Sequence, residues 1–260
     1  MEKVTIKLSG GLGNFLFQIS AAYSYSLIHG KEFHIDYRNI NSVHTNYQKY
    51  LDNIFMGITF GKYNNTYITY TEPFFNYTQI PYIKGDVILD GYFQSEKYFI
   101  ENESSIYNLF KPKDSQIEYL TNKYNQLSLD NTCSIHVRRG NYLHLSNYHP
   151  VLELDYYKRA ISLVGEDMFF YILSDDIEWC EQNLGFLKNK IFVKEHLDLY
   201  ELYLISMCKN NINANSTFSW WGSWLNKNPN KQVIFPKTWF GSNYRSHSTE
   251  DLFFEKSIII

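Results

Sequence analysis

The run from Ser134 to Asn141 carries the residue types in this sequence that are best suited to bind an anion. An apolar stretch containing His136 leads to the adjacent arginines Arg138 and Arg139, and a glycine and Asn141 follow. Guanidinium groups match phosphate oxygens in bidentate geometry, and two of them can offset the charge on a departing diphosphate without a metal ion. The run therefore predicts a diphosphate clamp at the end of a buried strand. The alternative is an interface ion pair for one arginine and a surface position for the other.

A second polar segment, Ser174, Asp175 and Asp176, follows another apolar stretch. Three interpretations of its acids are open: metal ligands, hydrogen-bond acceptors for a base or ribose, or a helix capping box with Asp175 at the N-cap and Glu178 at N3. Because the sequence has no D-x-D triplet, we expect no metal ion here.

In the third segment, Asn215, Ser216, Thr217 and Phe218, small polar side chains lead from a strand into a helix. Hydroxyl groups and free backbone N–H groups at a helix N-terminus form a phosphate cradle. The alternative is an ordinary Ser/Thr N-cap. We expect the tryptophans that follow to pack in the core.

The fourth segment is the turn from Gly10 to Asn14, after the first strand. A dinucleotide fingerprint would need a small residue where Leu16 stands, so NAD binding is not expected. Gly11 and Gly13 allow the backbone to approach a ligand closely, and Asn14 can cap a helix or bind a sugar or phosphate. A plain tight turn explains the same residues.

The second half of the chain alternates short apolar strands with helices. We expect strands at 133–137, 168–173, 190–193, 211–214 and 232–235, and helices at 154–164, 176–184, 199–208 and 218–225. Such alternation predicts a parallel sheet that is covered on both faces. Ligands bind at the carboxyl ends of the strands in sheets of this kind, which is where the first three segments lie.

The first half is less regular. We expect a strand before Gly10, a helix over about 15–28 with its C-cap at Gly30, strands at 31–36 and 86–90, a cap at Ser95 and a helix over about 115–126. The Tyr-rich stretch 38–84 is predicted to form loops and short elements, whose rings suit sugar stacking and ordinary half-buried packing equally. The polar stretch 127–131 predicts a boundary between domains 1–127 and 128–260.

Composition excludes several classes of protein. The chain is 44% hydrophobic with a net charge of −3 and has no Lys/Arg block, so we expect no nucleic-acid partner. Cys133, Cys180 and Cys208 lack C-x-x-C spacing and are interpreted as buried thiols of a reducing compartment. The N-terminus has no apolar stretch of the length of a signal peptide or an anchor, which favours the cytosol.

Together with Gly91–Phe99, these segments resemble the family 11 glycosyltransferases, the alpha-1,2-fucosyltransferases, in order from Gly10 to about Phe240. The resemblance implies an α/β, GT-B-like fold of two Rossmann-type halves, with residues 1–127 on the acceptor side and 128–260 binding GDP-fucose. It further implies transfer to the 2-hydroxyl of a β-galactoside with inversion and without a cofactor or metal. The acceptor would be a surface glycan or a lipid-linked oligosaccharide at the cytosolic face of a membrane.

The resemblance also implies roles for individual residues. Arg138 and Arg139 would hold the donor diphosphate, and His136 would lie near the nucleoside. Ser216, Thr217 and Phe218 would complete the diphosphate pocket. From the other domain, Asn14 would face the fucose or the diphosphate.

The chain departs from the family pattern at Asn141, where the double-arginine motif usually carries aspartate. An amide retains part of the hydrogen bonding of a carboxylate but cannot act as a base. Three outcomes follow: a weakened enzyme, an enzyme for another GDP-6-deoxysugar such as GDP-colitose, or a non-catalytic glycan- or nucleotide-binding protein. The candidates for a general base, which the sequence does not rank, are His144, His149, Glu153 and Asp155.

Overall fold

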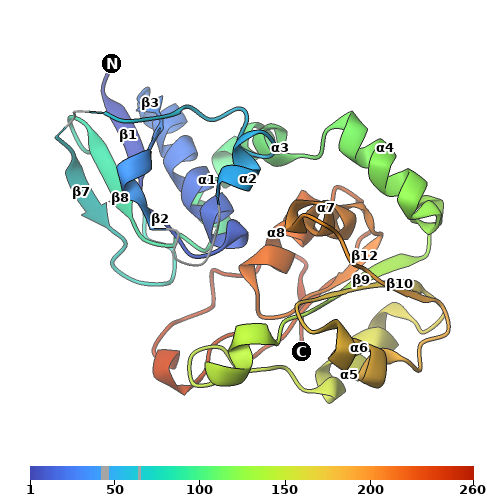
Figure 1. Cartoon of the computed structure of the whole chain (residues 1–260). Coiled ribbons are helices and arrows are strands. Elements are labelled where there is room, and N and C mark those ends of the chain that lie inside the picture. Colours follow the sequence, from blue (N-terminus) through green and yellow to red (C-terminus); the bar gives the residue numbers. More distant parts are fainter. Residues whose placement is uncertain (42–46, 64–65) are drawn as a thin grey trace. The chain divides into compact units, whose positions relative to one another are not determined.

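The computed structural model describes residues 1–41, 47–63 and 66–260, and the chain forms two compact units. The first unit contains Met1–Lys111 and His247–Phe254, and the second contains Pro112–Ser246 and Glu255–Ile260. Each unit is built on a parallel β-sheet (Figure 1), so the expected α/β fold with two Rossmann-type halves is confirmed.

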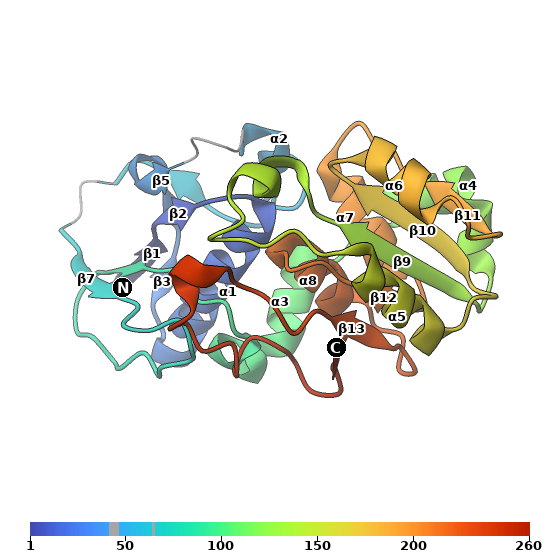
Figure 2. The same ribbon diagram turned by 90° about the horizontal axis from the view of Figure 1, so that it is seen from below.

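The second unit contains a six-stranded parallel sheet, and Figure 2 labels its strands from β11 to β13. In spatial order its strands are β11 (Lys190–Phe192), β10 (Phe169–Ser174), β9 (Thr132–Val137), β12 (Asn210–Ile212), β13 (Val233–Phe235) and β14 (Ile258–Ile259). Every residue of the central strand β9 is buried. Its apolar residues Cys133, Ile135 and Val137 alternate with Thr132, Ser134 and His136, so small polar side chains are buried on one face of this strand.

Four helices cover this sheet: α5 (Leu154–Val164), α6 (Ile177–Leu184), α7 (Asp198–Met207) and α8 (Thr217–Leu225). Figure 1 shows α7 and α8 on one face and α5 and α6 on the other. The α8 tryptophans Trp220, Trp221 and Trp224 are buried, as predicted. Five strands and all four helices of the second half lie within a few residues of their predicted positions. The short strand β14 was not predicted.

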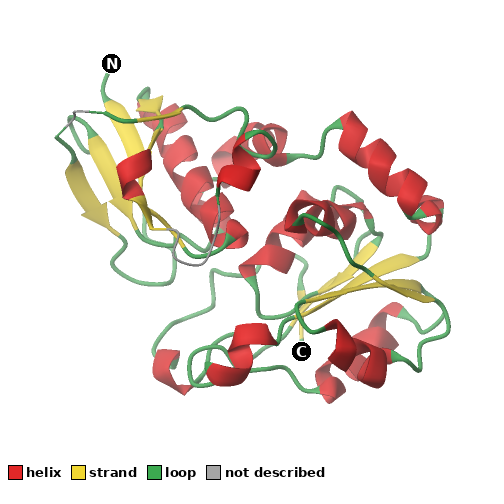
Figure 3. Ribbon diagram, viewed as in Figure 1, coloured by secondary structure: helices red, strands yellow, loops and turns green. Residues whose placement is uncertain are grey.

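The first unit has a four-stranded parallel sheet in the order β3 (Glu32–Phe33), β1 (Lys3–Ile6), β8 (Val87–Asp90) and β7 (Ile68–Thr71). Two short parallel pairs accompany it: β2 (Leu8–Ser9) with β5 (Ile40–Asn41), and β4 (Ile35–Asp36) with β6 (Phe60–Gly61). Its helices are α1 (Leu12–His29), α2 (Gln48–Leu51) and α3 (Glu103–Phe110) (Figure 3). The C-cap of α1 is Gly30 in the left-handed conformation with φ 61°, as the sequence predicted.

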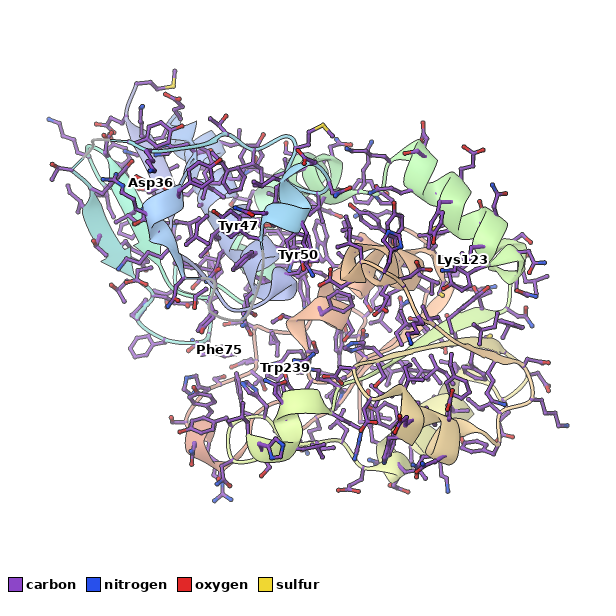
Figure 4. The ribbon with its side chains drawn as sticks, in the orientation of Figure 1. Asp36, Tyr47, Tyr50, Phe75, Lys123 and Trp239 are labelled. Carbon is purple, nitrogen blue, oxygen red and sulfur yellow. The ribbon has the colours of Figure 1, made fainter. Side chains whose placement is uncertain are left out.

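The units divide between Lys111 and Pro112, whereas the sequence placed the boundary after residue 127. Helix α4 (Asp114–Lys123) therefore belongs to the second unit. The reason is its packing: the Tyr119 ring lies 4.8 Å from that of Tyr200 on α7. The Tyr124 hydroxyl, one residue beyond α4, donates to the buried Glu195 carboxylate at 2.7 Å, and Lys123 (Figure 4) forms an ion pair with the same carboxylate at 2.7 Å. The polar stretch 127–131 contains the end of a 3-10 helix, Asn125–Ser128, and the turn before β9.

The C-terminal segment His247–Phe254 returns to the first unit. Its Asp251 accepts a hydrogen bond from the backbone N–H of Tyr77 at 3.0 Å and forms an ion pair with Lys97. This return was not predicted, because its contacts join residues more than 150 positions apart in the sequence.

The three cysteines are buried free thiols, as predicted. Among the residues that the structure describes, no helix is long and apolar enough to cross a membrane.

Candidate functional site

The strand order of the second unit contains a topological switch point. From β9 the chain adds β10 and β11 on one side, and then β12, β13 and β14 on the other. In parallel sheets of this kind the carboxyl ends of the two strands at the switch point, here β9 and β12, flank a ligand-binding crevice. The predicted segments at Arg138, Ser174 and Asn215 follow β9, β10 and β12, so they gather at this edge.

Arg138 is held by three neighbours. Its Nη1 lies 3.0 Å from Asp175 Oδ2, and its Nη2 donates to Asn141 Oδ1 at 2.7 Å. Its guanidinium carbon lies 5.2 Å from the centre of the Tyr142 ring. The side chain is 35% exposed. Because a guanidinium carries five N–H donors, these contacts fix its plane and leave donors for an anion.

Arg139 lies beside a different acid. Its Nε donates to Asp176 Oδ2 at 3.0 Å, and its guanidinium packs over the Trp179 ring at 4.4 Å. The backbone N–H of Arg139 also donates to Asp175 Oδ1 at 2.8 Å. Each arginine thus has its own carboxylate and its own aromatic ring.

The acids after β10 position these arginines. Ser174 Oγ accepts from the backbone N–H of Asp176 at 2.9 Å. The predicted capping box was wrong by one residue: the N-cap of α6 is Asp176, whose side chain accepts from Trp179 N at 3.1 Å. Asp175 turns instead toward the loop after β9 and contacts both arginines there. Its place requires Gly140, because a Cβ on Gly140 would lie 2.3 Å from Asp175 Oδ2.

His136 occupies the buried base of this edge. Its ring centre lies 5.5 Å from that of Phe218, which connects the β9 end with the start of α8. Burial, with a smaller contribution from Arg138, lowers the pKa of His136 to about 3, so the imidazole is neutral at physiological pH. Within the described part of the chain, the buried Nδ1 atom of His136 has no hydrogen-bond partner. Buried polar atoms of this kind are uncommon and indicate a ligand contact or a water.

Asn215 and Ser216 shape the opposite wall. The Asn215 amide donates to the backbone oxygens of Pro150 and Trp239 (Figure 4), at 2.9 and 3.2 Å. Its buried Oδ1 has no hydrogen-bond partner among the residues described. Ser216 is the N-cap of α8 and accepts from Phe218 N at 3.3 Å, and Thr217 is the first residue of that helix. The hydroxyl segment therefore caps α8 and also presents the start of that helix at the carboxyl edge.

The glycine turn belongs to the first unit and is described there by itself. Gly10 has φ 89°, and a Cβ on it would lie 2.2 Å from the Asn14 amide, so only glycine fits. Gly11 is the N-cap of α1, and Gly13 and Asn14 lie in its first turn. Asn14 therefore does not cap the helix. Its Oδ1 accepts from Gln94 Nε2 at 3.1 Å, so the two amides of separate sequence motifs meet.

The turn before Gln94 is held by the half-buried carboxylate of Glu72, which directly follows β7. Both carboxylate oxygens of Glu72 accept from the backbone N–H of Phe93 at 3.1 Å, and Oε2 also accepts from the backbone N–H of Tyr92 at 2.7 Å. Phe93 adopts a left-handed φ of 51°, which is uncommon for an aromatic residue and is held by these bonds. Ser95 next to it caps a 3-10 helix, Glu96–Tyr98.

The sequence analysis missed Tyr142, Trp179 and Gln94, each of which orients a predicted residue. Their signals were weak: Tyr142 lies on a 3-10 turn that was not predicted, and Trp179 lies on the predicted helix α6, where an aromatic residue reads as ordinary packing. Of the base candidates, His149 stacks on Tyr142 with ring centres 4.9 Å apart, while His144, Glu153 and Asp155 are exposed. Among the described residues, no group of three or more His, Cys, Asp or Glu side chains could hold a metal ion.

Comparison with known proteins identifies the family. The model of the family described as Glycosyl transferase family 11 matches residues 2–258. The chain belongs to glycosyltransferase family 11. The O-antigen biosynthesis glycosyltransferase WbnK of Escherichia coli is 30% identical to this family 11 chain over 94% of its length and 97% of the relative's.

Two other relatives carry more specific names. The alpha-1,2-colitosyltransferase of Escherichia coli is 27% identical over 92% of this chain and 93% of its own. The galactoside 2-alpha-L-fucosyltransferase of Caenorhabditis elegans is 27% identical over 55% of this chain and 43% of its own. Among solved structures, the fucosyltransferase NodZ from Bradyrhizobium has a similar fold, with a TM-score of 0.55 and 14% identity over 86% of this chain and 92% of NodZ.

Proposed function

We propose that this family 11 glycosyltransferase moves L-fucose from GDP-fucose to the 2-hydroxyl of a β-galactoside in a surface glycan, with inversion at the anomeric carbon. The observation that carries the proposal is the pair Arg138 and Arg139, held at the switch point by separate carboxylates and separate rings. Such a pair suits a diphosphate, the group common to sugar-nucleotide donors. The names of the relatives WbnK and galactoside 2-alpha-L-fucosyltransferase support the acceptor and the sugar.

The proposed reaction is a direct displacement. The acceptor oxygen forms a bond to C1 of the fucose as the bond from C1 to the diphosphate oxygen breaks, and the electron pair of that bond leaves with GDP. The negative charge that develops on the leaving oxygen needs donors that are oriented before the reaction. Arg138 and Arg139 are fixed in this way by their protein neighbours, so no metal ion is required in the proposal.

The nucleoside would lie toward His136. Its neutral ring and the unpartnered Nδ1 can exchange a hydrogen bond with a ribose or base without adding charge. The unpartnered Oδ1 of Asn215 offers a second acceptor on the other side of the switch point. Asn14, which accepts a hydrogen bond from Gln94, is proposed as a further donor contact.

Asn141 favours an active enzyme over a protein that only binds. Its Oδ1 accepts from Arg138 at 2.7 Å, which is the contact that one oxygen of an aspartate would make. Orientation of the arginine is thereby retained, while the charge is lost. The hydrogen bond between two ions becomes a weaker one from a cation to a neutral acceptor, so we expect a lower rate and not an absence of catalysis.

A second donor is supported by a separate observation. The alpha-1,2-colitosyltransferase matches this chain over nearly its full length, and GDP-colitose would use the same nucleotide contacts.

The proton of the acceptor hydroxyl must also be removed. Among the base candidates, His149 is the one whose ring stacks on Tyr142, the residue that packs against Arg138. Burial and Arg138 lower the pKa of His149, which keeps its ring neutral and able to accept a proton.

The test is incubation of the full chain with GDP-fucose, GDP-colitose or GDP-mannose, each with and without a β-galactoside. We expect acceptor-dependent GDP release with a 6-deoxysugar donor, and an α-1,2 linkage in the product by NMR. Acceptor-dependent GDP release with GDP-mannose and with neither of the other two donors would refute the 6-deoxysugar assignment. If the chain binds added GDP but releases no GDP from any donor, it is a non-catalytic binding protein.

A further inference from the structure

Tyr142 is the aromatic residue that connects both sides of the switch point. It lies in the 3-10 helix Gly140–His144 after β9, where its ring packs against the Arg138 guanidinium. Its hydroxyl reaches the loop after β12 and donates to the backbone oxygen of Asn215 at 3.2 Å. One side chain is therefore fixed to the two loops that border the crevice.

The Tyr142 ring is itself supported from the same loop. His149 stacks on it with an angle of 18° between the rings, and the His149 ring lies 6.3 Å from Phe240 and 6.2 Å from Tyr244. The backbone N–H of Gly241 donates to Tyr148 O at 2.9 Å, which fastens the segment of Phe240 and Tyr244 to the segment of His149. The ring thus rests on a packed aromatic layer.

These contacts divide the orientation of Arg138 into two parts. Asp175 and Asn141 bind the edge of the guanidinium and set its direction within its plane. Within the described part of the chain, the Tyr142 ring is the aromatic group that packs against the guanidinium, and it sets the plane itself. A guanidinium can bind a diphosphate through parallel hydrogen bonds only when its plane contains the phosphate oxygens.

We propose that Tyr142 is a positioning residue that holds the plane of Arg138 for the donor diphosphate through its aromatic face. The proposal rests on the proposed function, because it assigns the diphosphate to Arg138. Tyr142 acts through the arginine and does not contact the donor. The Tyr142 hydroxyl donates to the backbone oxygen of Asn215 and also interacts with the Arg138 side chain, so the test must separate the ring from the hydroxyl.

The test compares the affinities of GDP and of guanosine, by calorimetry at constant ionic strength, for the wild type, Tyr142→Phe and Tyr142→Leu. The ratio of the two affinities isolates the diphosphate. We expect Tyr142→Leu to lower this ratio about tenfold, the size of one cation–π contact in a partly desolvated site. Tyr142→Phe keeps the ring and should retain most of the ratio. Tyr200→Leu, on α7 against Tyr119, is the matched control outside this aromatic layer and should leave the ratio unchanged.

A role in folding alone would lower the affinities of GDP and guanosine together and leave their ratio unchanged, which would overturn the proposal. If Tyr142→Leu does not fold, phenylalanine analogues with increasing fluorination at position 142 preserve the shape of the ring and weaken its negative face. The ratio should then fall as fluorination rises, and a constant ratio would overturn the proposal. A wild type that binds GDP no better than guanosine would instead refute the diphosphate site of the proposed function.

Discussion

Gly140→Ala tests whether Asp175 aligns the arginines. Gly140 is not among the glycines with left-handed φ in the described structure, so alanine fits the backbone there. The new Cβ would lie 2.3 Å from Asp175 Oδ2 and 2.9 Å from its Cγ. Carbon and oxygen atoms need roughly 3.4 Å or more, so the carboxylate must withdraw by about 1 Å. It cannot do so and keep both Arg138 Nη1 and Arg139 N as partners.

The expected size follows from the displacement. A shift of about 1 Å in a group that aligns the reacting parts can cost on the order of 10²-fold in rate. We therefore expect Gly140→Ala to lower kcat/KM for transfer by about that factor, with a melting temperature within a few degrees of the wild type, since Asp175 is partly exposed.

A double-mutant cycle isolates the cause. Asp175→Ala removes the group that the new methyl group meets, so Gly140→Ala should have little further effect in that background. We expect the double variant to match Asp175→Ala within about twofold. If Gly140→Ala costs the same factor in both backgrounds, or costs nothing in the wild type, the reasoning from Asp175 is refuted.

Three further predictions concern other neighbours of the site. Because the native pKa of His136 is about 3, only the unfolded chain gains this proton as pH falls below about 6.5. The free energy of unfolding should then fall by up to roughly 1.4 kcal/mol for each pH unit. Urea titrations at pH 4 to 7 should show that His136→Phe removes this part of the slope. Parallel plots of unfolding free energy against pH for the wild type and the variant would contradict the prediction. Gln94→Leu removes the hydrogen bond that Gln94 donates to Asn14 and should lower kcat/KM by roughly tenfold, whereas an unchanged value would show that Gln94 has no role in donor binding. Asn141→Leu should slow transfer by about tenfold through Arg138 while Asn141→Asp does not, and equal rates in both would mean that the amide contact has no role.

The elements of the second unit could be predicted because their sequence signal is local. Strand β10 contains the continuous apolar run Phe169–Leu173, and helix α5 buries Tyr157, Ala160, Ile161 and Val164 on one face. Both elements could therefore be predicted without knowledge of their partners. The Gly30 cap was equally legible, since a left-handed residue at a helix end favours glycine.

The boundary between the units could not be predicted in this way. Helix α4 belongs with α7 because Tyr119 contacts Tyr200 and the buried carboxylate of Glu195. These two partners lie more than 70 residues after Tyr119 in the sequence. A polar stretch marks a loop, and a boundary depends on which contacts cross it.

The site shows the same division. The residue types that bind an anion were visible as motifs, but their orientation depends on side chains from other turns. Asp176 and not Asp175 caps α6 because the helix begins at Ile177, and a shift of one residue in that start is not visible in the sequence. Tyr142 reaches Arg138 only because residues 140–144 form a 3-10 turn, which no periodic pattern in the sequence announces.

Turnover of Arg138→Ala tests the central claim most directly. With GDP-fucose or the donor found in the screen, and with a β-galactoside, we expect the rate to fall by roughly 10² to 10³, as for the loss of one preorganised charge donor. Circular dichroism and the melting temperature should show an intact fold. Turnover at the wild-type rate in a folded Arg138→Ala variant would contradict the diphosphate clamp.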